Sequence, residues 1–133
     1  MRVLLLSAYE AVSHRYWANS LMAEVNEVDW TLLSLPPRYF SWRIRGNPLS
    51  WWLKEYQRLN QPYDVVLATS MVDIATLVGL FPHLGRARKI VYFHENQFAY
   101  PESSEQMPQV EAKMVNLYAA LAADVLVFNT AYN

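Results

Sequence analysis

The sequence predicts an α/β fold, with a Rossmann-like parallel sheet of about five strands flanked by helices. Short apolar runs recur along the chain and are continuous, as in strands that are covered on both faces. Segments with apolar residues at helical spacing separate these runs, and such alternation implies right-handed crossovers between parallel strands. The 133 residues, 53% hydrophobic and 17% charged, suffice for one globular domain and are too few for two.

The first strand is predicted over residues 3–7. Ser13 can cap the helix that follows, whose buried stripe is expected at every fourth residue from Trp17 to Val25. The second strand, residues 29–35, ends at two consecutive prolines, which cannot continue a strand ladder.

The segment over residues 38–47 is expected to be irregular, and Pro48 suits the first turn of a helix that ends near residue 59. Ser70 or Asp73 can cap a helix that ends near residue 80. The later strands are expected over residues 65–69, 90–93 and 124–128, and the last helix over residues 109–122. The buried face of that last helix is expected to carry Val110, Met114, Leu117 and Leu121. A chain that stops at Asn133, just after a strand, resembles one lobe of a larger protein.

Composition narrows the classes of function. The chain has no cysteine, which excludes disulfide frameworks and thiolate metal sites. A net charge of −1 argues against a dedicated nucleic-acid coat but allows a local basic patch. No apolar run approaches the ~20 residues of a membrane helix, so a cytoplasmic location without membrane contact is expected.

The loop after the first strand, residues 7–15, contains no glycine. A dinucleotide-binding domain needs glycines here so that backbone amides can approach a pyrophosphate. NAD and FAD are therefore not expected, and no other cofactor is predicted. Tyr9 and His14 are candidate substrate contacts, although a surface cluster at a helix start explains them equally well. Ser70 and Asp73 follow the third strand at the same edge and are further candidates, with helix capping as the alternative.

Four polar residues follow the fourth strand, namely His94, Glu95, Asn96 and Gln97. Ligands of open parallel sheets bind beyond the carboxyl ends of the strands. An imidazole and a carboxylate can move protons there, so His94 and Glu95 are candidate catalytic residues. The amides of Asn96 and Gln97 are candidate substrate contacts. A zinc site is not expected, because the metalloprotease pattern needs a histidine where Phe98 stands. Alternatively, His94 is only a hydrogen-bonded residue at a strand end.

The segment over residues 38–47 combines three arginines with three aromatic residues and contains no acid. Guanidinium groups pair with phosphates, and aromatic faces stack on unpaired bases. Contact with nucleic acid is one interpretation; the other places the aromatic residues on the core and the arginines in solvent. The candidate RNA-binding residues are Arg38, Tyr39, Trp42, Arg43 and Arg45.

Four segments closely resemble the tRNA-queuosine alpha-mannosyltransferase family. They comprise residues 35–46, 68–73, 92–101 and 128–133, and the third includes the run Tyr-Phe-His-Glu-Asn-Gln. They occur in the order found in that family, and the similarity spans essentially the whole chain. It corresponds to the N-terminal domain of the family.

The resemblance implies a retaining glycosyltransferase of the two-lobed GT-B fold, which transfers mannose from GDP-mannose to queuosine in the anticodon of tRNA-Asp. Residues 1–133 would form the acceptor-side lobe, and the lobe that binds most of the nucleotide sugar is absent. In related retaining enzymes a histidine after a strand of this lobe lines the reaction centre, and His94 matches that position. The isolated lobe is expected to be inactive. A stand-alone, non-catalytic Rossmann-like module that binds a ligand or RNA is the alternative.

Overall fold

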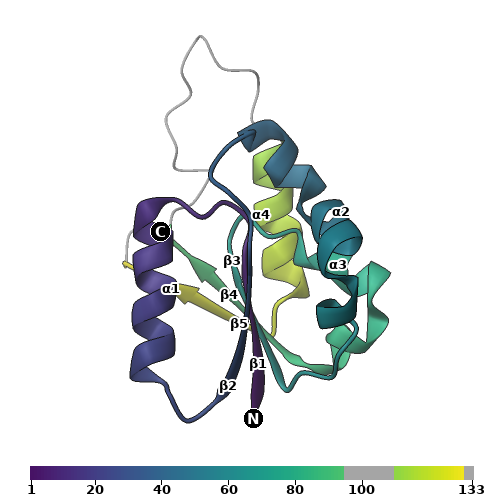
Figure 1. Ribbon diagram of the computed structural model, residues 1–133. Helices are drawn as coiled ribbons and strands as arrows, with labels where there is room; N and C mark the ends of the chain where they lie inside the picture. The colour runs from purple at the N-terminus through teal and green to yellow at the C-terminus, as the bar shows by residue number, and fades with distance from the viewer. Residues whose placement is uncertain (95–109, 131–133) are drawn as a thin grey trace.

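The computed structural model describes residues 1–94 and 110–130 and confirms the predicted α/β class (Figure 1). Five strands form one parallel sheet in the order β2-β1-β3-β4-β5. The strands are β1 (Arg2–Ser7), β2 (Asp29–Ser34), β3 (Val65–Thr69), β4 (Arg88–Phe93) and β5 (Val125–Phe128). The helices are α1 (Val12–Glu24), α2 (Phe40–Leu59), α3 (Ile74–Leu80), the short 3-10 helix η1 (Pro82–Arg86) and α4 (Val110–Ala122).

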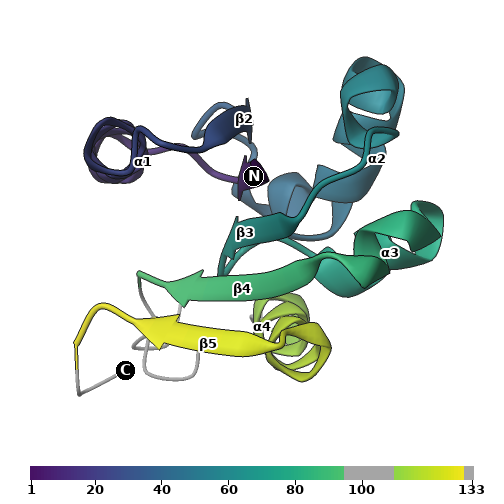
Figure 2. The same ribbon diagram turned by 90° about the horizontal axis from the view of Figure 1, so that it is seen from below.

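Helices lie on both sides of this sheet. α1 covers one face, whereas α2, α3 and α4 lie on the other (Figure 2). This division follows from the strand order, because right-handed crossovers that run in opposite directions along a sheet place their helices on opposite faces. The core consists mainly of β1 and the residues packed on it; Leu4, Leu5 and Leu6 are completely buried, and Trp51 of α2 is nearly so. Among the described helices, none is long and apolar enough to cross a membrane.

α2 begins at Phe40, so the segment predicted to be irregular is largely helical, and Pro48 lies inside the helix instead of in its first turn. A proline within a helix lacks an N–H group and displaces the carbonyl four residues earlier. The side chain of Asn47 compensates for this loss. Its Nδ2 donates to the carbonyl oxygen of Ile44 at 3.0 Å and to that of Arg43 at 2.6 Å. The helix therefore continues through Pro48.

Three details of the other helices also differ from the prediction. Ala11 occupies the N-cap position of α1 and makes no side-chain hydrogen bond, so the predicted cap at Ser13 is wrong. α4 packs closely against α2 and α3, and the residues on its buried face are therefore mostly small. Its buried residues are Ala112, Val115, Asn116 and Ala119, whereas the predicted Val110, Leu117 and Leu121 are exposed. In α1, Ala18 is buried, and Val25 of the predicted stripe is 42% exposed.

Candidate functional site

A pair of stacked histidine rings lies at the carboxyl edge of the sheet. His94 follows β4 and His14 lies in the first turn of α1, with their ring centroids 4.2 Å apart and their planes inclined by 23°. The Nδ1 atom of His14 lies 2.9 Å from the carbonyl oxygen of Tyr9. Because a carbonyl oxygen only accepts, Nδ1 of His14 carries the hydrogen. The structure thus brings together three residues that the sequence had placed in two separate candidate sites.

Two aromatic residues that were not predicted as site residues surround His94. Trp17 of α1 and Tyr92 of β4 each contact the His94 ring edge-on with centroids 4.7 Å apart, and they contact each other at 4.5 Å. A signal for both exists in the sequence. Tyr92 precedes His94 by two residues and so shares its face of the strand, and Trp17 lies one helical turn after His14.

This enclosure changes the acid–base chemistry of His94. Burial, together with the neighbouring His14, lowers the pKa of His94 from 6.5 to about 4. At neutral pH the imidazole is therefore uncharged. A neutral imidazole can accept a hydrogen bond from a hydroxyl group, but with so low a pKa it holds a proton only weakly. The lowered pKa thus favours orientation of a hydroxyl group by His94 over storage of its proton.

The lowered pKa predicts how stability depends on pH. Between the unfolded value of 6.5 and the folded value of about 4, the unfolded chain binds more protons at this residue. The stabilisation that the neutral form of His94 gives the folded chain is therefore fully present above the unfolded pKa of 6.5. It is lost as the pH falls toward the folded pKa of about 4. We expect the stability of His94→Gln, which cannot titrate, to fall less than that of the unsubstituted chain on acidification. Urea unfolding from neutral pH downward measures this, and parallel curves for the two chains would contradict it.

Tyr9 connects the histidine pair to the start of α2. Its ring contacts the ring of Phe40 edge-on, with centroids 5.4 Å apart. Phe40 directly follows Tyr39, which is 71% exposed and whose ring centroid lies 5.8 Å from the guanidinium carbon of Arg38. Tyr39 has a φ of 58°, in the left-handed region that is unfavourable for a side chain of this size. Such strain is typical of positions where function constrains the backbone.

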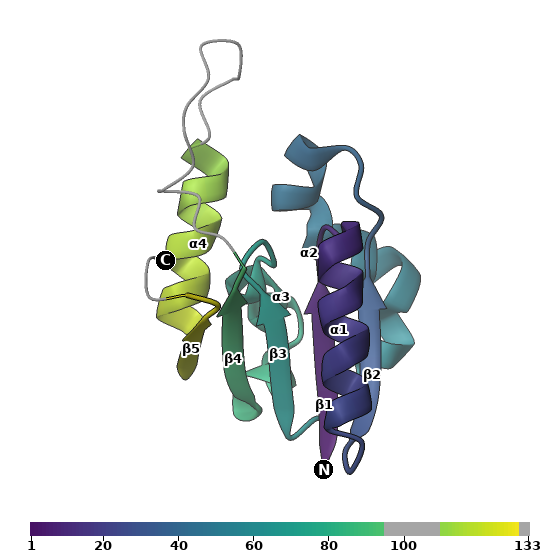
Figure 3. The same cartoon turned by 90° about the vertical axis from the view of Figure 1, so that its left-hand side faces the viewer.

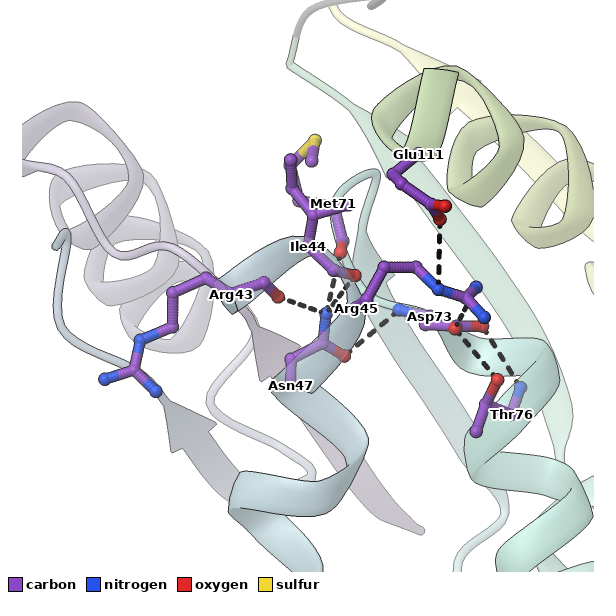
Figure 4. A network of polar contacts seen from close by, with 8 residues as sticks. All are labelled: Arg43, Ile44, Arg45, Asn47, Met71, Asp73, Thr76 and Glu111. Carbon is purple, nitrogen blue, oxygen red and sulfur yellow. Dashed lines mark hydrogen bonds and ion pairs between the residues drawn. The ribbon is translucent and has the colours of Figure 1, made fainter. Parts of the chain in front are cut away.

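The three arginines of this segment have different surroundings. Arg38 is exposed. Arg45 lies between two carboxylates, with Nη1 3.0 Å from Asp73 and Nε 3.3 Å from Glu111 (Figure 4). Arg43 is 8% exposed and its side chain points away from that network; its Nη1 donates to the hydroxyl of Ser50 at 3.4 Å. Among the described residues, no carboxylate forms an ion pair with Arg43.

Ser70 and Asp73 are buried near the ends of β3 and α3. Asp73 accepts hydrogen bonds from the backbone N–H of Thr76 at 3.2 Å and from its hydroxyl at 2.8 Å, which confirms it as the cap of α3. The carbonyl oxygen of Ser70 accepts a hydrogen bond from Asn116 Nδ2 at 2.9 Å. Both residues are 2–3% exposed, so these contacts serve packing. A role in substrate binding stays a prediction.

Glu95, Asn96 and Gln97 lie outside the described residues, so their predicted roles stay predictions. The carbonyl oxygen of His94 accepts a hydrogen bond of 2.7 Å from Asn129 Nδ2, which ties the ends of β4 and β5 together. Within residues 1–94 and 110–130, no three histidine, aspartate or glutamate side chains gather as a metal site would require.

The chain is similar in sequence to known proteins. The family model described as tRNA-queuosine alpha-mannosyltransferase N-terminal matches residues 2–133. A Drosophila melanogaster protein named tRNA-queuosine alpha-mannosyltransferase is 31% identical over 131 residues, which cover 98% of this chain and 34% of that relative. The chain thus spans about a third of the length of the curated relative. No solved structure matches it significantly.

Proposed function

The chain belongs to the tRNA-queuosine alpha-mannosyltransferase family, and from this premise we propose that it forms the acceptor-side lobe of a retaining, two-lobed GT-B glycosyltransferase. The complete cytoplasmic enzyme transfers mannose from GDP-mannose to the cyclopentenediol of queuosine in the anticodon of tRNA-Asp. A second lobe binds most of the nucleotide sugar, so residues 1–133 alone are inactive. The reaction needs no metal or cofactor.

The observation that carries this proposal is the link through Tyr9. Its carbonyl oxygen binds His14, which stacks on His94, and its ring contacts Phe40 at the start of α2. These contacts support a single site that combines a hydroxyl-orienting group with an exposed arginine–aromatic surface. A glycosyltransferase that modifies a base in an RNA loop needs both features side by side.

The low pKa of His94 supports a hydroxyl-orienting role for this residue in the transfer. The acceptor oxygen forms a bond to the anomeric carbon while the bond from that carbon to the β-phosphate of GDP breaks. The phosphate leaves with the bonding electrons and has a pKa near ~6 for its second ionisation, above the value of about 4 for His94. The hydroxyl proton therefore passes to the departing phosphate. His94 holds the acceptor hydroxyl in line by accepting its hydrogen bond.

The exposed arginine–aromatic surface fits the anticodon loop. Arg38 and Tyr39 lie together at the solvent-exposed start of α2, and Trp42 is 54% exposed. Unstacked loop bases bind to such aromatic faces, and guanidinium groups bind the phosphates between them. Arg43 is 8% exposed and forms no ion pair among the described residues, whereas the charge of Arg45 is already balanced by Asp73 and Glu111.

Replacing Arg38, Arg43 and Arg45 together should weaken tRNA binding by the complete enzyme and flatten its salt dependence. Singly, Arg38→Ala should lower the salt slope of log K by about 0.7, the value for one single-strand phosphate contact. Arg45→Ala should change the slope less, because two carboxylates already neutralise Arg45. Filter binding over a range of salt concentrations measures the slopes. Arg86→Ala, an exposed arginine of η1, is the control; an equal effect there would contradict a specific surface.

The direct test of the proposed function uses the full-length protein, queuosine-containing tRNA and a panel of nucleotide sugars. We expect the modified base to gain the mass of one hexose with GDP-mannose and the 133-residue chain to give no transfer. Binding of tRNA without any transfer by the full-length protein would instead support the stand-alone binding module. Transfer by the 133-residue chain would contradict the requirement for a second lobe.

A further inference from the structure

Gly46 of α2 lies directly under the indole ring of Trp42. A Cβ atom at position 46 would lie 2.5 Å from Cε2 of Trp42 and 2.8 Å from its Cδ2 and Nε1, well inside the ~3.5–4.0 Å at which carbon atoms normally touch. These three ring atoms are consecutive, so similar distances to all of them place that point over the face of the indole. The ring therefore lies flat on the backbone of Gly46, and only a residue without a Cβ atom leaves room for it.

A hydrogen bond holds the same ring from a second direction. Nε1 of Trp42 donates to the hydroxyl of Ser50 at 3.4 Å, and Nη1 of Arg43 donates to the same oxygen at 3.4 Å. Both distances are longer than the ~2.7–3.2 Å of a typical N–H···O bond, so the contact with Gly46 fixes the ring more firmly than the hydroxyl does. The indole N–H is thereby bonded within the protein, and the ring offers a ligand only its face.

The rest of the Trp42 ring is open to solvent. Trp42 is 54% exposed although one face of its ring is covered, whereas Trp51 of the same helix is 1% exposed. The first turns of α2 lie beyond the carboxyl ends of the strands, at the end of the sheet where α1 begins (Figure 3). A tryptophan held only for packing would bury both faces of its ring. A fixed ring with one open face is instead suited to stack on a planar group of a ligand.

The neighbouring residues indicate the chemistry of that ligand. Arg38 and Tyr39 are exposed just before α2, and residues 38–47 contain no acidic residue. Such a surface fits a ligand that combines a planar ring with negative charge, as a nucleotide does. A sugar without phosphate would leave the arginine charge unused.

We propose that Gly46 is a positioning residue that fixes Trp42 as a stacking platform for an unpaired nucleobase. The inference rests on the proposed function, which supplies two sources of such a base: the anticodon loop of the tRNA and the guanine of GDP-mannose. Both present the same chemistry to Trp42, and separate probes distinguish them. Because every base has a π-face and the indole N–H is already bonded, the platform should accept a base without reading its identity.

Gly46→Ala in the full-length protein tests the proposal, with an RNA hairpin that carries the anticodon loop and with GDP as the two probes. We expect hairpin binding to weaken by at least about fivefold, the lower limit for loss of one stacked base. The salt slope of log K should stay unchanged because no phosphate contact is lost, and a blunt RNA duplex should bind equally well to both proteins. Weakening confined to GDP would assign the platform to the donor base. Unchanged binding of both probes, or equal weakening for hairpin and duplex, would overturn the proposal.

Two further comparisons separate positioning from a merely structural role. Gly79→Ala is the matched control, because Gly79 lies inside α3 and an added Cβ would have no atom within 4 Å; its binding should be unchanged. Trp42→Ala removes the platform and the clash together, so it should weaken hairpin binding by itself. Gly46→Ala added to it should leave the fold intact by circular dichroism and weaken binding no further.

Normal hairpin binding by Trp42→Ala, or an unfolded double variant, would also overturn the proposal, because Gly46 would then act through a different contact. These binding measurements need no sugar transfer, so failure of the proposed function in the transfer assay would not obscure them.

Discussion

His94→Ala in the complete enzyme should lower kcat by about 10²-fold while tRNA affinity stays unchanged. Orientation and proton transfer by a positioned side chain contribute ~10²–10⁴-fold, and the low pKa of His94 points to the lower end. His94 lies against α1, with His14 and Trp17 on its ring, whereas Arg38 lies just before α2 and Arg45 lies on it. Loss of the imidazole should therefore affect the reacting hydroxyl and leave the RNA surface intact. Single-turnover kinetics and filter binding measure the two quantities.

Two further variants sharpen this test. His94→Gln can still accept a hydrogen bond through its amide oxygen but cannot titrate, so it should retain part of the activity if His94 orients the hydroxyl. His83→Ala is the matched control, because His83 lies on η1 and contacts the carbonyl oxygen of Leu59. If His94→Ala weakened tRNA binding and left kcat unchanged, the catalytic role of His94 would be wrong.

Local sequence patterns predicted those strands and helices whose formation depends on interactions within a few residues. The strands and the α/β alternation were predictable, because continuous apolar runs and punctuating prolines act over a few residues. The extent of α2 was not predictable, because the helix continues past Pro48 only with the help of the Asn47 side chain. The buried face of α4 was also missed. Large apolar residues were expected inside, but Ala112 and Ala119 allow the close approach that packing requires.

The candidate site was predictable only in part for a similar reason. His94 could be predicted because the end of a parallel strand is a ligand-binding position. Its stacking on His14 depends on where α1 lies across the sheet, and no local pattern contains that information. The same limit applies to the arginines: the three lie close together in one short segment of the sequence, but only tertiary contacts show that Asp73 and Glu111 neutralise Arg45.

Asn47→Ala should lower the free energy of unfolding by about 3–5 kcal/mol. Asn47 is completely buried and donates to the carbonyl oxygens of Arg43, Ile44 and Met71, while its Oδ1 accepts from the backbone N–H of Asp73. Each buried polar group left without a partner costs ~1–3 kcal/mol, and several would be left here. Such a loss is a large share of the ~5–15 kcal/mol that stabilises a typical domain. Urea unfolding followed by tryptophan fluorescence measures the change, with Asn60→Ala at the exposed end of α2 as the control.

A double substitution separates helix repair from simple loss of packing. Pro48→Ala restores an N–H group that can bond to the carbonyl of Ile44, the group that Asn47 otherwise satisfies. Asn47→Ala should therefore cost about 1 kcal/mol less in the Pro48→Ala background than alone, the net worth of one backbone hydrogen bond. Strictly additive effects would mean that Asn47 acts only through its links to Met71 and Asp73. A coupling of the expected sign would identify Asn47 as the residue that permits a proline inside α2 and so holds the exposed arginine–aromatic surface in place.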